Sequence, residues 1–323
     1  MILLIFSARG ARFDHAGTLS LRQRPSEQAV TVYNFGSINI DIIYRVPHLV
    51  KPGETLASLS MDTVLGGKGA NQSVALARAG VHTRHIGRIG DGDQWASKQL
   101  SDAGVDISSV ESIAGPSGHA IIQVDDQGEN SIVLHGGANQ SFSREDMEKH
   151  LADATADDWL LIQNECNDCA SAMDVALQKG MSVAFNPAPM TPEVSALPLE
   201  RCAVLIVNET EAAQLASATD PDEVLNLLEV KYPDTRLVLT LGSKGALLRF
   251  KGEQIRQDAS RVDVVDTTGA GDTFVGFFLS ALIQGLDDQL CLRRGCAAAA
   301  LSVGVAGATP SIPDAAAVDE FLA

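Results

Sequence analysis

The fold is decided by the stretch Asp266-Thr267-Thr268-Gly269-Ala270-Gly271-Asp272-Thr273-Phe274, which leads into a long apolar run ending at residue 283. Glycine lets the backbone turn tightly and approach a ligand closely. The first N–H groups of a helix have no partner within the helix, and the helix dipole is positive there. We therefore predict a buried helix over residues 271–283. We also predict an anion hole for a phosphate, formed by the N–H groups of Gly269, Ala270 and Gly271.

Asp272 lies at the start of this predicted helix, and the residues alone leave two interpretations open. An aspartate at this position is commonly an N-cap, and position alone favours that interpretation. A carboxylate beside a bound phosphate is costly, however, unless it has a chemical role. Removing the proton from an attacking hydroxyl is such a role. Asp272 is therefore also a candidate catalytic base.

The pattern on either side of this stretch alternates between short apolar runs and helical periods. We predict strands over residues 30–35, 85–89, 160–163, 181–185, 204–207, 237–241 and 246–250. We predict further helices over residues 70–79, 170–179 and 292–303. This alternation indicates an α/β fold with a mostly parallel central sheet and helices on both faces.

Two segments break the alternation. Residues 120–124 and 131–135 read as two strands joined by a polar turn, which is the pattern of a hairpin. Residues 41–66 also lack a helical period. We expect the segments near 41–66 and 116–136 to form a small β-sheet lid, which suits an enzyme that excludes water. Residues 1–28 read as a poorly ordered extension before one domain over residues 29–323.

Composition narrows the possible partners. The formal net charge is -17, so the surface should repel nucleic acids and anionic membranes, and ATP binding would need local donors. Five cysteines at irregular spacing favour reduced thiols and a cytoplasmic protein. We find no convincing secretory signal and no apolar run long enough to span a bilayer. The usual phosphate loop and a complete dinucleotide fingerprint are both absent.

Several motifs together resemble the ribokinase-like carbohydrate kinases. The stretch 266–274 is similar to the C-terminal signature of that family, and residues 66–72 (Gly-Gly-Lys-Gly-Ala-Asn-Gln) are similar to its N-terminal signature. Further matches follow in the family's order at residues 36–41, 135–139, 186–189, 208–211 and 240–245. The resemblance runs from about residue 30 to the C-terminus. It implies a three-layer ribokinase-like fold with a small β-sheet lid.

The resemblance also implies roles for matching residues. The residues implied to bind the substrate are Asn39, Asp41, Gly67, Lys68, Asn71, Glu165 and Asp272. The residues implied to bind the nucleotide are Asn208, Glu211, Thr240 and Gly242. Asn208 and Glu211 would position Mg²⁺ through water, although the same pair also resembles a capping box. Asp272 would be the catalytic base.

A monovalent cation site near the anion hole is implied as well. The residues implied to form it are Asp266, Thr268, Ser302, Val305, Gly307 and Ser311. Potassium would be the expected ion, held by oxygen atoms alone and acting on the shape of the loop.

The implied activity is an ATP-dependent sugar kinase. It would transfer the γ-phosphate to the primary hydroxyl of a small sugar, with D-ribose giving ribose 5-phosphate. Fructose, deoxyribose and adenosine remain alternative acceptors within the family. A non-catalytic sugar- or nucleotide-binding regulator is the alternative from another class. Because an open sheet edge invites pairing, a homodimer through the lid is also expected.

Overall fold

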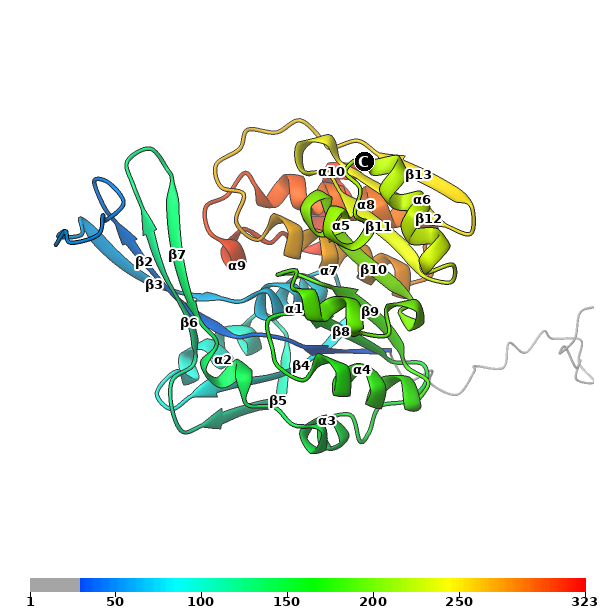
Figure 1. Cartoon of the computed structure of the whole chain (residues 1–323), viewed down its shortest axis with the longest axis horizontal. Helices are drawn as coiled ribbons and strands as arrows, with labels where there is room; N and C mark the ends of the chain where they lie inside the picture. Colours follow the sequence, from blue (N-terminus) through cyan, green and yellow to red (C-terminus); the bar gives the residue numbers. More distant parts are fainter. Residues whose placement is uncertain (1–29) are drawn as a thin grey trace, which may run out of the picture.

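The computed structural model describes residues 30–323, so the predicted extension over residues 1–28 lies outside the described residues. Figure 1 shows a layered body from which a separate group of strands projects on one side. Both parts agree with the predicted fold class.

A nine-stranded sheet forms the centre of the body, in the order β13-β12-β11-β10-β9-β8-β1-β4-β5. Its strands are β1 (Thr31–Phe35), β4 (His82–Gly90), β5 (Asp106–Ile113), β8 (Trp159–Gln163), β9 (Ser182–Asn186), β10 (Val204–Asn208), β11 (Arg236–Thr240), β12 (Ala246–Phe250) and β13 (Glu253–Gln257). The seven neighbouring strands β5, β4, β1, β8, β9, β10 and β11 pair in parallel. β12 pairs antiparallel with β11, and β13 pairs antiparallel with β12. The predicted strands are confirmed. β5 and β13 were not predicted, because neither contains a sustained apolar run.

Helices cover both faces of this sheet. They are α1 (Lys68–Arg78), α2 (Gln94–Asp102), α3 (Arg144–His150), α4 (Cys169–Gln178), α5 (Glu209–Ala216), α6 (Pro221–Lys231), α7 (Ala270–Ile283), α8 (Asp288–Ser302), α9 (Ala308–Ser311) and α10 (Ala315–Leu322). Short 3-10 turns are η1 (Gly137–Gln140), η2 (Pro192–Ala196), η3 (Leu199–Arg201) and η4 (Gly242–Lys244).

The two faces of the sheet bury separate apolar clusters. In β8, Leu160 and Ile162 pack with α3 to α6, whereas Leu161 between them packs with α7 and α8. Side chains alternate in this way along any strand, so a strand buried on both faces reads as a continuous apolar run. α1, α2 and α10 share a third cluster with α7, α8 and the base of the lid.

A four-stranded sheet in the order β3-β2-β6-β7 forms the lid. Its strands are β2 (Asn39–Arg45), β3 (Ser60–Gly66), β6 (Gly118–Val124) and β7 (Asn130–His135). β6 and β7 pair antiparallel, so the predicted hairpin is confirmed. In this sheet Asp41 pairs with Val64 on one side and Ala120 on the other. Figure 1 shows the lid strands extending away from the body.

None of the helices within residues 30–323 combines the length and the apolar character needed to cross a membrane.

Helices α1 and α7 approach each other closely at Gly276. A Cβ atom built on Gly276 would lie 2.3 Å from the Cβ of Ala75 and 2.9 Å from the backbone nitrogen of Leu76. Such distances are shorter than any van der Waals contact, so the glycine is required for this packing.

We predict that Gly276→Ala lowers the free energy of unfolding by about 1–3 kcal/mol, because the added methyl group overpacks the α1–α7 contact. Urea denaturation measures this difference. Gly304→Ala is the matched control. A Cβ atom built on Gly304 would lie 3.4 and 3.9 Å from the carbonyl oxygen atoms of Leu301 and Asp263, which are ordinary contact distances. Equal stability of both variants and the parent protein would contradict the packing argument.

Candidate active site

The site is built around the N-terminus of α7. Gly269 is the N-cap and has a φ of 75°, a left-handed conformation that glycine adopts without strain. Helix α7 begins at Ala270, so Asp272 lies in its first turn and does not cap it. The capping interpretation of Asp272 is therefore wrong. The N–H of Ala270 donates to the carbonyl of Thr267 at 3.3 Å.

The carboxylate of Asp272 is held by two amides of α1. The Nδ2 atom of Asn71 donates to Oδ2 at 3.0 Å, and the Nε2 atom of Gln72 donates to Oδ1 at 2.9 Å. Asp272 is only 7% exposed, so these two donors replace water around the charge. Gln72 lies within the motif at residues 66–72, but no role was predicted for it. Its position next to Asn71 was the available signal.

Further buried amides hold Gln72 in place. Its Oε1 atom accepts a hydrogen bond from Nε2 of Gln163 on β8 at 2.7 Å. Its Nε2 atom also donates to Oδ1 of Asn186 on β9 at 3.0 Å. Gln163 in turn donates to Oδ1 of Asn34 on β1 at 2.9 Å. The orientation of Asp272 is therefore fixed by hydrogen bonds that extend across the centre of the sheet.

A cavity of about 250 Å³ lies beside Asp272. Its lining includes seven of the residues predicted from the sequence, which are Lys68, Asn208, Glu211, Thr240, Gly269, Gly271 and Asp272. The structure thus gathers predicted residues from four separate motifs around one small cavity.

Lys68 is the first residue of α1 and brings positive charge to this cavity. The carboxylate of Asp272 raises the pKa of Lys68, with smaller contributions from Glu165 and Glu211, while burial acts in the opposite direction. The ammonium group therefore stays protonated among three carboxylates. It is the group that can balance their charge when a phosphate approaches.

Asn208 and Glu211 form a capping box at the start of α5. The N–H of Glu211 donates to Oδ1 of Asn208 at 2.9 Å, and the N–H of Asn208 donates to Oε2 of Glu211 at 3.0 Å. The capping interpretation is therefore confirmed. Both side chains also line the cavity beside Asp272. Burial raises the pKa of Glu211, the largest of several causes.

A second cavity, of about 680 Å³, also reaches the N-terminus of α7. It shares Thr240, Thr267 and Gly271 with the first cavity. Its further lining is mainly apolar and includes Val262, Val264, Phe274, Cys296, Ala299, Ala300 and Val303. Gly242 lies at its edge with a φ of 56°. An apolar cavity next to a helix N-terminus can hold a planar ring with a phosphate attached.

Two carboxylates lie close together at the base of the lid. Burial raises the pKa of Asp41 to about 6, and the negative charge of Glu165 adds to this effect. Glu165 accepts hydrogen bonds from the hydroxyl of Ser37 and, at 3.0 Å, from the N–H of Lys68. A Cβ atom on Gly66 would lie 2.0 Å from Oδ2 of Asp41, so any larger residue there would displace this carboxylate.

Gly67 and Asn39, which were also predicted to bind the substrate, lie near the same end of the lid. Gly67 is the N-cap of α1 with a φ of 95°, which favours glycine. Asn39 is 5% exposed, and its Oδ1 atom accepts a hydrogen bond from Nδ2 of Asn139 at 2.8 Å. The segment carrying Asn139 therefore contacts the predicted sugar side.

Three of the predicted cation ligands, Asp266, Thr268 and Gly307, lie near one another. Asp266 accepts hydrogen bonds from the N–H and hydroxyl of Thr268, at 2.9 and 2.6 Å, and from the N–H of Gly307 at 2.8 Å. Burial acts to raise the pKa of Asp266, but these hydrogen bonds outweigh it and lower that pKa. Ser302 is the last residue of α8 and Ser311 the last residue of α9. Val305 and Gly307 lie in the loop between these two helices.

Comparison with known proteins agrees with this arrangement. Residues 31–315 match the pfkB family of carbohydrate kinases. The chain belongs to this family. A ribokinase of Haemophilus influenzae is 36% identical over 90% of this chain and 98% of its own length. A deoxyribokinase of Salmonella typhi is 30% identical over 89% of this chain and 97% of its own length.

A solved structure of Arabidopsis thaliana ribokinase, complexed with ribose and ATP, superposes with a TM-score of 0.83. It is 33% identical and matches 91% of this chain and 99% of its own. The predicted fold is therefore confirmed. As a pfkB carbohydrate kinase, the protein is a phosphotransferase that uses an alcohol as the acceptor.

We predict that the carboxyl of Asp41 titrates with a midpoint near pH 6 in the ligand-free protein, because burial and Glu165 both raise its pKa. The Glu165→Gln variant should move this midpoint to lower pH, since it removes a negative charge but leaves the larger effect of burial. A ¹³C NMR titration of the side-chain carboxyl measures both values.

Asp62→Asn is the matched control, because Asp62 is an exposed carboxylate on the neighbouring lid strand β3. It should leave the Asp41 midpoint unchanged. A parent midpoint near pH 4 would contradict the burial of this carboxyl.

Proposed function

We propose that this protein transfers the γ-phosphate of ATP to the primary hydroxyl of D-ribose, forming ribose 5-phosphate. The observation that carries the proposal is the carboxylate of Asp272. It is buried, accepts hydrogen bonds from two amides, and lies in the first turn of α7, where it lines the smaller cavity. The similarity to ribokinases, including one complexed with ribose and ATP, supports the same reaction.

The nucleotide fits the larger cavity. Its base would lie among the apolar side chains, near Thr240 and Gly242. Its phosphates would reach the N-terminus of α7, where Gly269 and Gly271 line the smaller cavity. Asn208 and Glu211 would position Mg²⁺ there through water, since hard cations prefer oxygen ligands.

The sugar fits below the lid, near the start of β2 and the start of α1. The proposed hydroxyl-binding residues are Asn39, Asp41, Gly67, Lys68, Asn71 and Glu165. Carboxylates accept hydrogen bonds, an ammonium donates them, and an amide does both, so together they can read several hydroxyls. Asn71 would connect the sugar to the catalytic carboxylate, because its Nδ2 atom already donates to Asp272.

The chemical step requires one proton acceptor and one site for negative charge. Asp272 accepts the proton of the primary hydroxyl, whose oxygen bonds to the γ-phosphorus as the bond between that phosphorus and the leaving ADP oxygen breaks. The N–H groups of Gly269, Ala270 and Gly271 stabilise the charge on the transferred phosphoryl group. The carboxylate of Asp272 is the largest influence on the pKa of Lys68 and keeps its ammonium group charged, so Lys68 can offset the remaining negative charge.

A monovalent cation such as K⁺ would fit near Asp266 and the carbonyl of Thr268. The hydrogen bond from Gly307 to Asp266 keeps the two cation-site loops together beside α7. The ion would complete that oxygen-rich corner and set the shape of the anion hole. Because ATP is the proposed phosphate donor, we also propose that the protein works in the cytoplasm.

Deoxyribose is the second candidate acceptor, because a deoxyribokinase is among the relatives. It differs from ribose by one hydroxyl at carbon 2. A site that hydrogen-bonds that hydroxyl rejects the analogue lacking it. The Asp41 and Glu165 carboxylates offer such acceptors, which favours ribose.

We predict ATP- and Mg²⁺-dependent phosphorylation of ribose over deoxyribose, fructose, adenosine and uridine, with higher turnover in K⁺ than in choline. Asp272→Asn should lower kcat by at least about 10²-fold with ATP affinity nearly unchanged, since it removes the base but keeps the shape. A coupled ADP-release assay and ATP titration measure these values. ATP binding without turnover on any sugar would support the non-catalytic alternative.

A homodimer through the lid is the proposed assembly. The lid face that carries Asp41 continues across paired positions to Val64, Ala120 and Leu134. Leu134 is 54% exposed, and every residue of edge strand β7 is exposed. The lid of a second copy would cover this apolar face and stabilise the association.

We predict that Leu134→Asp converts the dimer into a monomer, as measured by light scattering. Val133→Asp is the matched control, because Val133 lies on the same strand with its side chain on the opposite face. A monomeric parent protein, or equal effects of both changes, would contradict a dimer through this face.

A further inference from the structure

The short turn η1 and the two residues after it, residues 137–142, contact two parts of the proposed sugar site. Asn139 is 2% exposed, and its side chain bonds both the backbone of Ile38 and the side chain of Asn39. Gln140 donates to the carbonyl of Glu165 at 2.8 Å. Asn39 and Glu165 belong to distant parts of the chain, so this segment sets their relative position.

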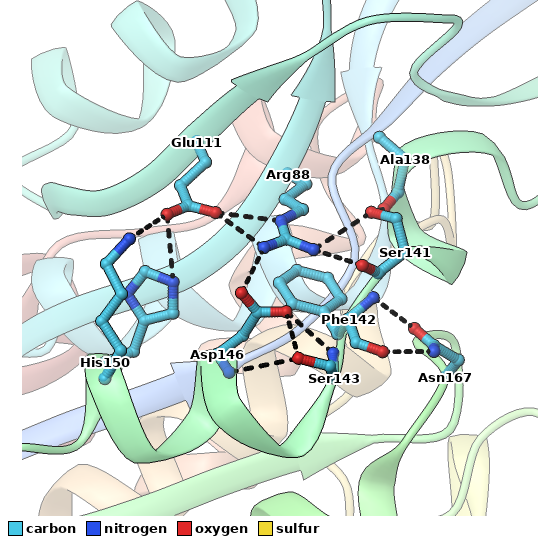
Figure 2. A network of polar contacts seen from close by, with 10 residues as sticks. Arg88, Glu111, Ala138, Ser141, Phe142, Ser143, Asp146, His150 and Asn167 are labelled. Carbon is cyan, nitrogen blue, oxygen red and sulfur yellow. Dashed lines mark hydrogen bonds and ion pairs between the residues drawn. The ribbon is translucent and has the colours of Figure 1, made fainter.

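A second connection joins the same segment to the loop after Glu165. The N–H of Phe142 donates to Oδ1 of Asn167 at 3.0 Å, and Nδ2 of Asn167 donates to the carbonyl of Phe142 at 2.8 Å. The N–H of Asn167 also donates to the carbonyl of Asn139 at 3.2 Å. The Asn167 amide thus pairs with both backbone groups of Phe142, as Figure 2 shows.

Arg88 of β4 contacts this segment at Ser141 and Phe142. Its Nη1 atom donates to the carbonyl of Ser141 and, at 3.4 Å, to the Ser141 hydroxyl. Its guanidinium group lies 4.5 Å from the centre of the Phe142 ring. The Ser141 hydroxyl donates to the carbonyl of Ala138 at 2.6 Å, which closes the turn. Arg88 therefore fixes the end of this segment at Ser141 and Phe142, as Figure 2 shows.

The remaining donors of Arg88 anchor it to two further elements. Nε and Nη2 donate to one oxygen of Glu111 on β5, at 3.0 and 2.8 Å. Nη2 also donates to Asp146 on α3 at 2.7 Å. Arg88 is 8% exposed, and all of its N–H-bearing nitrogen atoms are bonded. Only a planar guanidinium can reach these three directions at once; an ammonium group cannot.

Nearby charges complete the network. Lys149 donates to the other oxygen of Glu111 at 2.7 Å, and the ring of His150 lies 3.6 Å from that oxygen. Burial lowers the pKa of His150, which favours its neutral form. Two carboxylates thus face Arg88 and Lys149, so the network is charge-balanced without any ligand. None of these residues lines either cavity beside α7.

We propose that Arg88 is a positioning residue for the sugar subsite, acting through residues 137–142 on Asn39 and Glu165. This inference rests on the proposed function, because it assigns these two residues to the sugar. A residue that acts on the sugar side alone should change sugar affinity and leave the nucleotide side unchanged.

The test compares Arg88→Lys with a matched control, Arg84→Lys. Arg84 lies on the same strand, pairs with Asp106 of β5 at 2.8 Å, and lies over the ring of Tyr33. No bond joins it to residues 137–142 among the contacts described for this part of the chain. Arg88→Lys should raise the KM for ribose by about tenfold, the effect of one lost hydrogen bond. KM for ATP and kcat should stay within about twofold.

Arg84→Lys should leave all three constants unchanged. Equal effects of the two variants, or an equal rise in KM for ATP and ribose, would overturn the proposal. If Arg88→Lys does not fold, Asn167→Ala breaks the same connection from its other end and should give the same rise in KM for ribose.

Failure of the proposed function is distinguishable from failure of this inference. If the parent protein phosphorylates no sugar, the proposed function is wrong. The rate of amide hydrogen exchange then tests the inference without any substrate. Arg88→Lys should speed exchange in residues 137–142 and 165–167, and Arg84→Lys should not. Unchanged exchange in Arg88→Lys would overturn the inference.

Discussion

The pair of hydrogen bonds from Asn71 and Gln72 to the carboxylate of Asp272 is the interaction on which the site depends. A buried carboxylate at a helix N-terminus needs donors in place of water. Those donors come from α1, which can approach α7 only because Gly276 leaves room for it. The buried amide of Gln163 then connects α1 to the strands. The close packing of α1 against α7 is therefore also what fixes the orientation of the Asp272 carboxylate.

Electrostatics sets the second constraint. The chain carries a net charge of -17, yet its proposed ligand is a polyphosphate. Local features must overcome this field: the dipole of α7, the N–H groups at its start, and the ammonium of Lys68. The neighbouring carboxylates hold Lys68 in its charged form. Near the lid, neighbouring negative charge instead favours a neutral group. Burial, together with the charge of Glu165, raises the pKa of Asp41 and so favours its protonated form.

Much of this could be predicted from the sequence, because the decisive features are local. Gly66, Gly67, Gly269 and Gly271 lie at helix starts, and the alternation of short apolar runs with helical periods indicates a parallel sheet. The sequence could not reveal that Asp272 is not a cap, since Gly269 and Asp272 both lie where a cap could be. Nor could it reveal the hydrogen bonds made by Gln72 and Arg88. Their partners, such as Gln163 and Asp146, are distant in sequence and meet only through tertiary packing. The assignment of ligands to these positions remains a prediction.

The most direct test of the central claim is the single-turnover rate of phosphoryl transfer in Gln72→Leu, with ribose and ATP both saturating. Ser280→Ala is its control, because Ser280 is also buried but donates to the carbonyl of Ala79, outside the hydrogen bonds that hold Asp272. A misplaced base should slow transfer by about 10²-fold in Gln72→Leu, with an unchanged dissociation constant for ATP. A transfer rate equal to that of the parent protein would contradict the claim that Gln72 orients the catalytic carboxylate.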